Sequence, residues 1–250
     1  MSKTNGYILD EFDSPIDGKP CVAILTLRSD NRKTGDVCQV WILRRDVKPT
    51  DAINAGEDVS ICGNCPHRKG NSYSGKRTCY VRMTGPNSVW KAYKAKKYSS
   101  EFKWSDRHIL KGRHIRWGSY GDPAIINPQI FHQINQLAAE HTGFTHQWRE
   151  QFAQVYRGDF MASVDSFADY LDASAHGWKC YYVAPKGQQG HGKQCPATVE
   201  NSAAQCVTCR LCNGMKQDIW AEAHGVAAGF VGDIIKESQG KQSHESITSN

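Results

Sequence analysis

The fold is decided by residues 114–148, which read HIRWGSYGDPAIINPQIFHQINQLAAEHTGFTHQW. The first seven residues form a short strand pattern, and NPQIFHQINQLAAEH (127–141) predicts a helix with Asn127 as N-cap and Pro128 in the first turn. One face of this helix collects the apolar residues Ile130, Phe131, Ile134, Leu137 and Ala138. GFTHQW then begins a second strand or a turn. A strand, a helix and a strand at this spacing indicate parallel pairing through a right-handed crossover.

The same kinds of element continue on both sides of this stretch. Upstream, CVAILTL (21–27) and VCQVWIL (37–43) are short apolar runs that predict a hairpin or two adjacent strands. Downstream, Ser166 and Asp169 fit a capping box at the start of a second helix. The apolar stripe expected on this helix comprises Phe167, Tyr170 and Leu171. WKCYYVAP (178–185) is the next predicted strand.

These elements predict an α/β fold with a partial (β/α) barrel-like parallel sheet, cysteine-rich loops and a C-terminal extension that carries a second cysteine cluster. Residues 1–36 are interpreted as an N-terminal segment with the first strand, and residues 37–185 as the α/β core with the first cysteine cluster. Residues 186–236 carry the C-terminal cysteine cluster and a helix, and residues 237–250 are expected to be a disordered tail.

The composition sets limits on the class of protein. Of the 250 residues, 39% are hydrophobic, which is enough for a globular core, and the formal net charge of +6 is a modest excess that favours anionic partners. The sequence has no run of 18 apolar residues and no signal-peptide pattern, so we expect a cytoplasmic protein with no membrane partner. Ten cysteines in a reducing compartment indicate metal ligands rather than disulfides.

The first group of cysteines lies in residues 61–81, ICGNCPHRKGNSYSGKRTCYV, which we call the cysteine loop. Two residues separate Cys62 from Cys65, and thirteen residues separate Cys65 from Cys79. Three thiolates leave one position open on a metal or on one iron of a cluster, as a catalytic site requires. The alternative is a closed zinc site with a fourth ligand, for which the candidates are Cys38, His67 and His114.

The second group, which we call the C-terminal cysteines, consists of Cys195, Cys206, Cys209 and Cys212. A Cys-x-x-Cys-x-x-Cys run with a remote fourth cysteine favours an iron–sulfur cluster, whereas structural zinc more often uses two separated Cys-x-x-Cys pairs. The other three cysteines, Cys21, Cys38 and Cys180, lie in apolar strand patterns, and we expect them to be small buried residues.

Polar residues follow the predicted strands, at the edge where parallel sheets bind their ligands. GSYGDP follows HIRW, and its glycines would let backbone amides approach a ligand while Asp122 takes a ribose hydroxyl or an amino group. The candidate cofactor-binding residues at this edge are Gly118, Ser119, Tyr120, Gly121, Asp122, His146, Gln147, Ser163 and Asp165. A plain tight turn is the alternative for GSYGDP, and a structural histidine for His146. No Walker loop, nucleophile elbow or His-Glu-x-x-His motif occurs.

Residues 90–116 interleave basic and aromatic side chains. The basic residues are Lys91, Lys94, Lys96, Lys97, Lys103, Arg107, Lys111, Arg113 and Arg116, and the aromatic residues are Trp90, Tyr93, Tyr98, Phe102 and Trp104. This combination suits a single-stranded nucleic acid or an anionic peptide. The alternative is a solvated helix face whose aromatic rings pack inward.

An ordered set of motifs carries a family resemblance between about residues 35 and 225: CGNCPHR, IRWGSYGDPA, GFTHQW, MASVDS, GWKCYYV and CVTCRLCNG. The set resembles a family of phage- and plasmid-borne proteins known as gene product 88, which has no assigned activity. More loosely, the layout is similar to the radical S-adenosylmethionine (SAM) superfamily, whose partial (β/α) barrels carry a three-cysteine, four-iron cluster in the loop after the first strand. That superfamily usually spaces its cysteines as Cys-x-x-x-Cys-x-x-Cys, which differs from the spacing here.

The resemblance implies an iron–sulfur enzyme in the cytoplasm of a host cell, with an unidentified substrate. Cys62, Cys65 and Cys79 would hold a [4Fe–4S] cluster whose open iron binds SAM, and GSYGDP would stand where the superfamily holds the SAM amino group. The C-terminal cysteines would hold an auxiliary cluster or a structural metal. The alternative hypothesis is a zinc-stabilised nucleic-acid- or protein-binding module of a mobile element, with residues 90–116 as its binding face.

Overall fold

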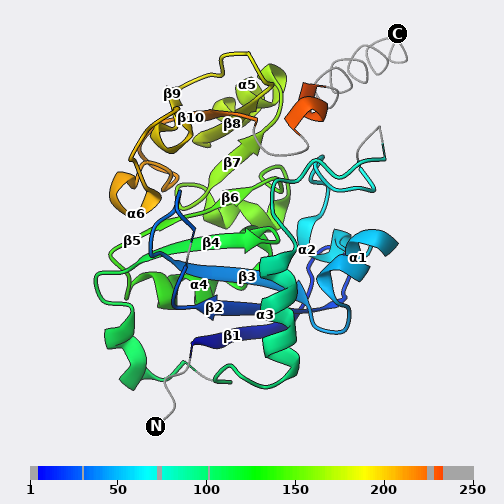
Figure 1. The fold of residues 1–250 in the computed structure, drawn as a ribbon, viewed down its shortest axis with the longest axis vertical. Coiled ribbons are helices and arrows are strands. Elements are labelled where there is room, and N and C mark those ends of the chain that lie inside the picture. The colour runs from blue at the N-terminus through cyan, green and yellow to red at the C-terminus, as the bar shows by residue number, and fades with distance from the viewer. Residues whose placement is uncertain (1–4, 30, 72–74, 101, 224–227, 233–250) are drawn as a thin grey trace.

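The computed structural model describes residues 5–29, 31–71, 75–100, 102–223 and 228–232. Its centre consists of two five-stranded sheets, sheet A in the order β1-β2-β3-β4-β5 and sheet B in the order β6-β7-β8-β10-β9 (Figure 1). The strands are β1 (Gly6–Asp13), β2 (Pro20–Thr26), β3 (Cys38–Arg44), β4 (His114–Tyr120), β5 (Glu140–Thr142), β6 (Phe144–Thr145), β7 (Met161–Val164), β8 (Cys180–Ala184), β9 (Lys193–Gln194) and β10 (Ile219–Glu222).

The two sheets form one run of strands because β5 and β6 are separated only by Gly143. A Cβ at this glycine would lie 2.3 Å from the ring of Phe160, so only glycine lets the backbone pass this close. In sheet A, β1, β2 and β3 pair antiparallel, whereas β3, β4 and β5 pair parallel. All pairs in sheet B are parallel.

The parallel strands therefore lie side by side in the order in which they occur in the chain: β3, β4, the consecutive strands β5 and β6, then β7, β8 and β10. Helices or irregular segments connect them. The described strands do not close into a barrel. This arrangement confirms the predicted α/β fold with a partial, barrel-like parallel sheet. It also places residues 1–36, which contribute β1 and β2, in the same sheet as the core.

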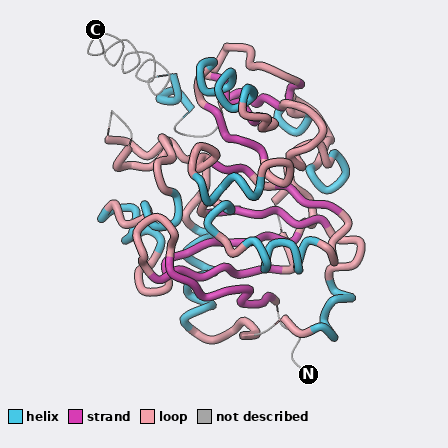
Figure 2. The backbone as a smooth tube through the Cα atoms, turned by 180° about the vertical axis from the view of Figure 1, so that it is seen from behind, coloured by secondary structure: helices cyan, strands magenta, loops and turns pink. Residues whose placement is uncertain are grey.

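Short helices cover the sheets. They are α1 (Pro49–Ala55), α2 (Val59–Cys62), α3 (Thr84–Lys94), α4 (Pro128–Asn135), α5 (Phe167–Ala175) and α6 (Cys206–Cys209), with 3-10 turns η1 (Trp104–Ile109), η2 (Pro123–Ile125), η3 (Gln151–Tyr156), η4 (Pro196–Thr198) and η5 (Ala228–Phe230). Helix α3 lies in front of sheet A in Figure 1 and α4 lies behind it, and Figure 2 shows the sheets from the α4 side. Phe131 of α4 packs edge-on against Trp117 of β4, with ring centroids 5.0 Å apart.

Most of the predicted elements are confirmed. The two upstream apolar runs form the antiparallel pair β2–β3, and HIRWGSY is β4. Asn127 caps α4 through its side chain, which accepts a hydrogen bond from Gln129 N, but the helix ends at Asn135 because the following residues turn into β5. Ser166 likewise caps α5 by accepting from Asp169 N.

The predicted stripe on α5 is wrong for Phe167 and Leu171, whereas Tyr170 packs against the buried cluster as expected. Phe167 is 47% exposed and Leu171 is 52% exposed, whereas Ala173 is fully buried. The helix packs on β7 and β8 through its small residues, and the Phe167 ring stacks on His191 instead, with centroids 4.4 Å apart.

Two further observations concern the ends of the chain and the membrane. The expected tail at 237–250 lies outside the described residues. Among the helices that the structure describes, none has the length and apolar character that crossing a membrane requires.

Candidate functional site

The cysteine loop lies against the carboxyl ends of the parallel strands. Asp122, which follows β4, donates its backbone N–H to Ile61 O over 2.6 Å. Gln147, which follows β6, donates from Nε2 to Cys62 O over 3.0 Å. The predicted residues that this edge brings together with the loop are Asp122, His146, Gln147 and Asp165.

Arg68 anchors the loop from within. Its guanidinium forms a buried ion pair with Asp58, with Nη2 and Oδ1 2.8 Å apart and both side chains less than 10% exposed. The same group donates to Gly63 O over 2.9 Å and to Gly56 O over 2.8 Å. A planar guanidinium can satisfy all of these acceptors at once, so Arg68 fixes the path of the backbone that carries the cysteines.

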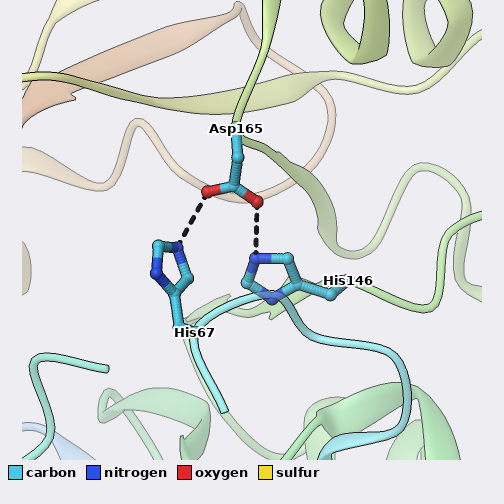
Figure 3. Close-up of side chains that lie close together, drawn as sticks. All are labelled: His67, His146 and Asp165. Carbon is cyan, nitrogen blue, oxygen red and sulfur yellow. Dashed lines mark hydrogen bonds and ion pairs between the residues drawn. The ribbon is translucent and has the colours of Figure 1, made fainter. Parts of the chain in front are cut away.

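A carboxylate between two imidazoles lies at the centre of this edge (Figure 3). Asp165 Oδ1 is 2.8 Å from His67 Nε2, and Asp165 Oδ2 is 3.1 Å from His146 Nε2. The three side chains are 8%, 12% and 20% exposed, in the order Asp165, His67 and His146. His67 Nδ1 pairs with Thr78 Oγ1 at 2.9 Å, and the backbone N–H of His146 donates to Asp122 Oδ2 over 2.8 Å. The His67 ring is thus held at both nitrogens, and His146 is held at Nε2 and at its backbone.

The electrostatics of this group are coupled. Burial raises the pKa of Asp165, but the two imidazoles outweigh burial and hold the pKa well below its ordinary value. Burial lowers the pKa of His146, but the Cys65 thiolate and Asp165 raise it well above its ordinary value. The same contact works in reverse, since His146, which is hydrogen-bonded to Cys65, outweighs burial and lowers the pKa of that thiol.

The three cysteines of the loop lie close enough for their charges to interact. Burial raises the pKa of Cys62, and the charges of Cys65 and Cys79 raise it further. Burial also raises the pKa of Cys79, to which Cys65 adds. Ionising all three thiols together therefore requires a positive charge among them, which a metal ion or an iron–sulfur cluster supplies.

The arrangement has two kinds of chemistry available. Three thiols, two imidazoles and a carboxylate are ligands for transition metals. The contacts from Cys65 to His146 and from His146 to Asp165 also give the order of nucleophile, base and orienting group found in thiol enzymes.

The GSYGDP segment is a tight connection between β4 and η2. Gly118 and Gly121 have φ values of +70° and +81°, and a Cβ at Gly121 would lie 2.7 Å from Ile42. Asp122 uses one carboxylate oxygen to accept from Ala124 N and the other to accept from His146 N. These two contacts position the backbone of both segments, and the role of Asp122 in cofactor binding stays a prediction.

The remaining predicted residues of the strand ends are buried near this edge. Tyr120 is 3% exposed, and the Cys62 and Cys79 charges add to burial in raising its pKa. Ser119 and Ser163 are each 7% exposed, and Ser163 O accepts from Trp148 Nε1 over 3.1 Å. Among the described residues, the hydroxyls of Ser119 and Tyr120 have no hydrogen-bond partner.

The C-terminal cysteines occupy a different place. All four line one pocket, together with apolar side chains such as Leu211 and Ile219. Cys206 N donates to Lys33 O and Val207 N to Thr34 O, which ties α6 to the turn between β2 and β3. Helices α2 and α6 consequently lie at opposite edges of the sheets (Figure 1). The segment with the C-terminal cysteines therefore packs on the β2–β3 turn, away from the strand ends that face the cysteine loop.

Of the three candidates for a fourth ligand to the loop, only His67 joins the site. Cys38 is fully buried in β3, and its Sγ contacts Leu27 O at 3.9 Å. His114 is buried beside Glu140 and Arg210. Burial also raises the pKa of Cys21 to about 12 and the pKa of Cys180 to about 11, as expected for structural cysteines.

The basic and aromatic stretch at 90–116 is split between surface and core. The rings of Trp90, Tyr93, Tyr98 and Phe102 are partly buried and pack on the core of sheet A. These rings follow the alternative in which the aromatic residues face inward. Arg116 lies within β4, where Nη2 donates to Tyr80 Oη over 2.6 Å.

Two parts of the site did not follow from the sequence. The pairing of His67 with Asp165 joins residues 98 positions apart. The sequence indicated His67 only as a candidate fourth ligand of a closed zinc site. Arg68 carried no signal except its position directly after Cys65-Pro-His.

Comparison of the chain with protein-family models, with curated proteins and with solved structures found no match.

Proposed function

We propose that the chain is an iron–sulfur enzyme of radical-SAM-like build. One observation carries this proposal: the cysteine loop follows β3, the first of the parallel strands, and lies across the carboxyl ends of the next ones. That position agrees with the layout of the superfamily that the sequence resembles. In such sheets the ligand-binding residues gather at the carboxyl edge.

The residues present fit a cluster with a bound polar cofactor. Cys62, Cys65 and Cys79 would hold the cluster, which when reduced supplies the electron that cleaves SAM. Beside them, Arg77 Nη2 and Tyr120 Oη are buried without a hydrogen-bond partner among the described residues. An arginine and a hydroxyl in this state suit the carboxylate of an amino-acid cofactor such as SAM.

The remaining residues would position the cluster and exclude water. Asp122 holds the backbone of His146, and His146 holds the Cys65 sulfur. Gln147 fixes the Cys62 carbonyl, and Arg68 fixes the loop between Cys62 and Cys65. The C-terminal cysteines would hold an auxiliary cluster or a structural metal, since four thiols in one pocket leave no open ligand position.

The test is anaerobic purification followed by iron and sulfide analysis, absorption near about 400 nm and an assay for SAM cleavage. We expect brown protein with iron at both cysteine groups. Colourless protein that carries zinc would contradict the proposal and favour the zinc-stabilised binding module.

Matched variants separate the two cysteine groups. Cys79→Ala is expected to abolish SAM cleavage and to remove the iron of the loop while the metal of the C-terminal cysteines stays. Cys206→Ala is expected to remove only the second metal. Loss of both metals in Cys79→Ala, with unfolding by circular dichroism, would instead indicate that the loop is purely structural.

A further inference from the structure

We propose that His67, His146 and Asp165 form a separate site for one divalent first-row transition metal, with Fe²⁺ as the preferred ion. Within the described residues, this is the one group of three histidine, cysteine or carboxylate ligand atoms that lie within 4.8 Å of one another. None of these three residues is a cysteine, although His146 also contacts Cys65, a ligand of the cluster proposed above.

The distances match those between neighbouring ligands of one ion. Nitrogen and oxygen ligands bind such metals at about 2.1 Å, so two ligands at right angles lie about 3 Å apart. The observed distances from the Asp165 oxygens are 2.8 Å to His67 Nε2 and 3.1 Å to His146 Nε2. The two rings are inclined by 73° with centroids 5.6 Å apart, so they approach the carboxylate from different directions.

The surroundings are those of ligating histidines. A metal-bound imidazole normally uses its second nitrogen in a hydrogen bond that fixes the ring, and His67 Nδ1 has this bond to Thr78 Oγ1 at 2.9 Å. Asp122 holds the backbone of His146, and β7 ends directly before Asp165. The ligands therefore come from three segments that are each fixed independently.

The ligand set indicates the class of metal. Two imidazoles and one carboxylate leave positions open for water or substrate and are typical of non-haem Fe²⁺ sites. With neutral imidazoles, the set carries one negative charge, which suits a dication. Asp165 would exchange its two hydrogen bonds for a bond to the ion, and each Nε2 would release its proton when it bears one.

The experiment uses Co²⁺ as a spectroscopic probe for Fe²⁺, added under anaerobic conditions to the full chain. Wild-type protein is expected to bind about one Co²⁺ more per chain than Asp165→Asn and His67→Gln. This equivalent should show the weak visible bands of nitrogen and oxygen ligation without the charge-transfer absorption of thiolates. Thr78→Val, which removes only the support of His67, is expected to weaken the binding about 10- to 100-fold.

Three controls make the result decisive. Asp159→Asn, at a different His–Asp pair, His141 and Asp159 at 3.8 Å, should bind as much Co²⁺ as wild type. Cys79→Ala should keep this Co²⁺ equivalent even though it loses the iron of the loop, so failure of the cluster proposal is distinguished from failure of this one. Equal Co²⁺ binding by wild type, Asp165→Asn and folded His67→Gln would overturn the proposal, as would a spectrum with thiolate bands alone.

Discussion

The two groups of cysteines differ in what surrounds them. The cysteine loop is joined to the strand ends by side chains, and its Cys65 thiol lies beside His67, His146 and Asp165. The C-terminal cysteines share a pocket with apolar side chains, and backbone hydrogen bonds from Cys206 and Val207 join their segment to the β2–β3 turn. Metal sites that react keep open positions and polar neighbours, whereas structural sites are closed by their own ligands. This contrast is the reason why we propose chemistry at the loop and a supporting role for the C-terminal group.

Arg116 lies between the two groups and interacts with both. It donates to Tyr80 in the cysteine loop, and the charges of Tyr80, Cys206 and Cys212 raise its pKa. A partly buried cation between two groups of thiols stabilises negative charge on either side. Disturbing each group should therefore have different consequences.

Removal of the loop anchor should have the largest effect. Arg68→Met leaves Asp58 buried without its partner, and we expect a loss of about 3–5 kcal/mol in the free energy of unfolding, measured by urea denaturation. Arg149→Met is the matched control, because Arg149 is 47% exposed and its ion pairs with Asp169 and Asp172 should contribute about 1 kcal/mol or less. Equal losses in the two variants would show that the loop is not held by this buried pair.

The second experiment compares the histidines of the two regions. His67 and His146 are paired with a carboxylate, whereas both ring nitrogens of His114 lack a partner among the described residues. Burial lowers the pKa of His114 to about 4. As the pH falls below about 6.5, His114 becomes protonated in the unfolded chain but stays neutral in the folded chain. The contribution of this residue to stability is therefore present above pH 6.5 and is lost as the pH falls toward 4.

Between pH 6.5 and pH 4, we expect the free energy of unfolding of the wild type to fall by about 3 kcal/mol more than that of His114→Gln. Denaturant unfolding of both proteins over this pH range measures the difference. Parallel pH profiles would contradict it and would mean that a charge in the surroundings accepts the protonated ring. The titratable or charged groups that act on His114 are Glu140, Arg210, His141 and Arg116.

The sequence predicted those parts of the molecule that depend on local pattern. Asn127 capped the expected helix, and the alternation of strands and helices brought Asp122, His146 and Asp165 to one edge, because parallel strands all end on the same side. The strand β1 was not recognised, since GYILDEFD mixes acidic and apolar residues at the edge of sheet A.

Sequence patterns did not predict the contacts between segments that are far apart in the chain. The positions of Cys206 against Lys33 and of His67 against Asp165 depend on how loops pack once the sheet has formed. Periodicity also failed on α5, because a 3.6-residue repeat shows which residues share a face but not whether that face is covered.

The third experiment tests the fit between the cysteine loop and the strand ends. Gly63 has φ +53° and ψ −129°, and a Cβ there would lie 2.3 Å from Gln147 Oε1. Gly63→Ala should cost about 2–3 kcal/mol, because it strains the backbone and displaces the amide that holds Cys62. Gly56→Ala is the control, since φ is +74° but no atom lies within 4 Å of the new Cβ, and it should cost about 1 kcal/mol. Thermal unfolding of both variants measures the two losses of stability. Equal losses would show that the Gln147 side chain moves aside at no cost.

The smallest effect is expected where the C-terminal cysteines meet the β2–β3 turn. The Val207 side chain packs on Gly35, where its Cγ1 would lie only 2.6 Å from an added Cβ, while backbone bonds from Cys206 and Val207 to residues 33 and 34 hold the segment. Val207→Ala removes two methyl groups from a half-buried side chain and should lower global stability by about 1 kcal/mol or less.

The effect of Val207→Ala should nevertheless be local. Backbone bonds remain, but the packing that keeps α6 on the turn is reduced, so we expect faster hydrogen exchange at the amides of residues 206 and 207 and unchanged exchange in the cysteine loop. If exchange in the loop rises as well, the two groups of cysteines are coupled, and Arg116, which contacts Tyr80 and lies near Cys206, is the residue through which a disturbance would pass. The exchange measurement on Val207→Ala combined with Arg116→Gln would then test whether Arg116 carries this coupling. Removal of the guanidinium should return exchange in the cysteine loop to the rate seen without Val207→Ala.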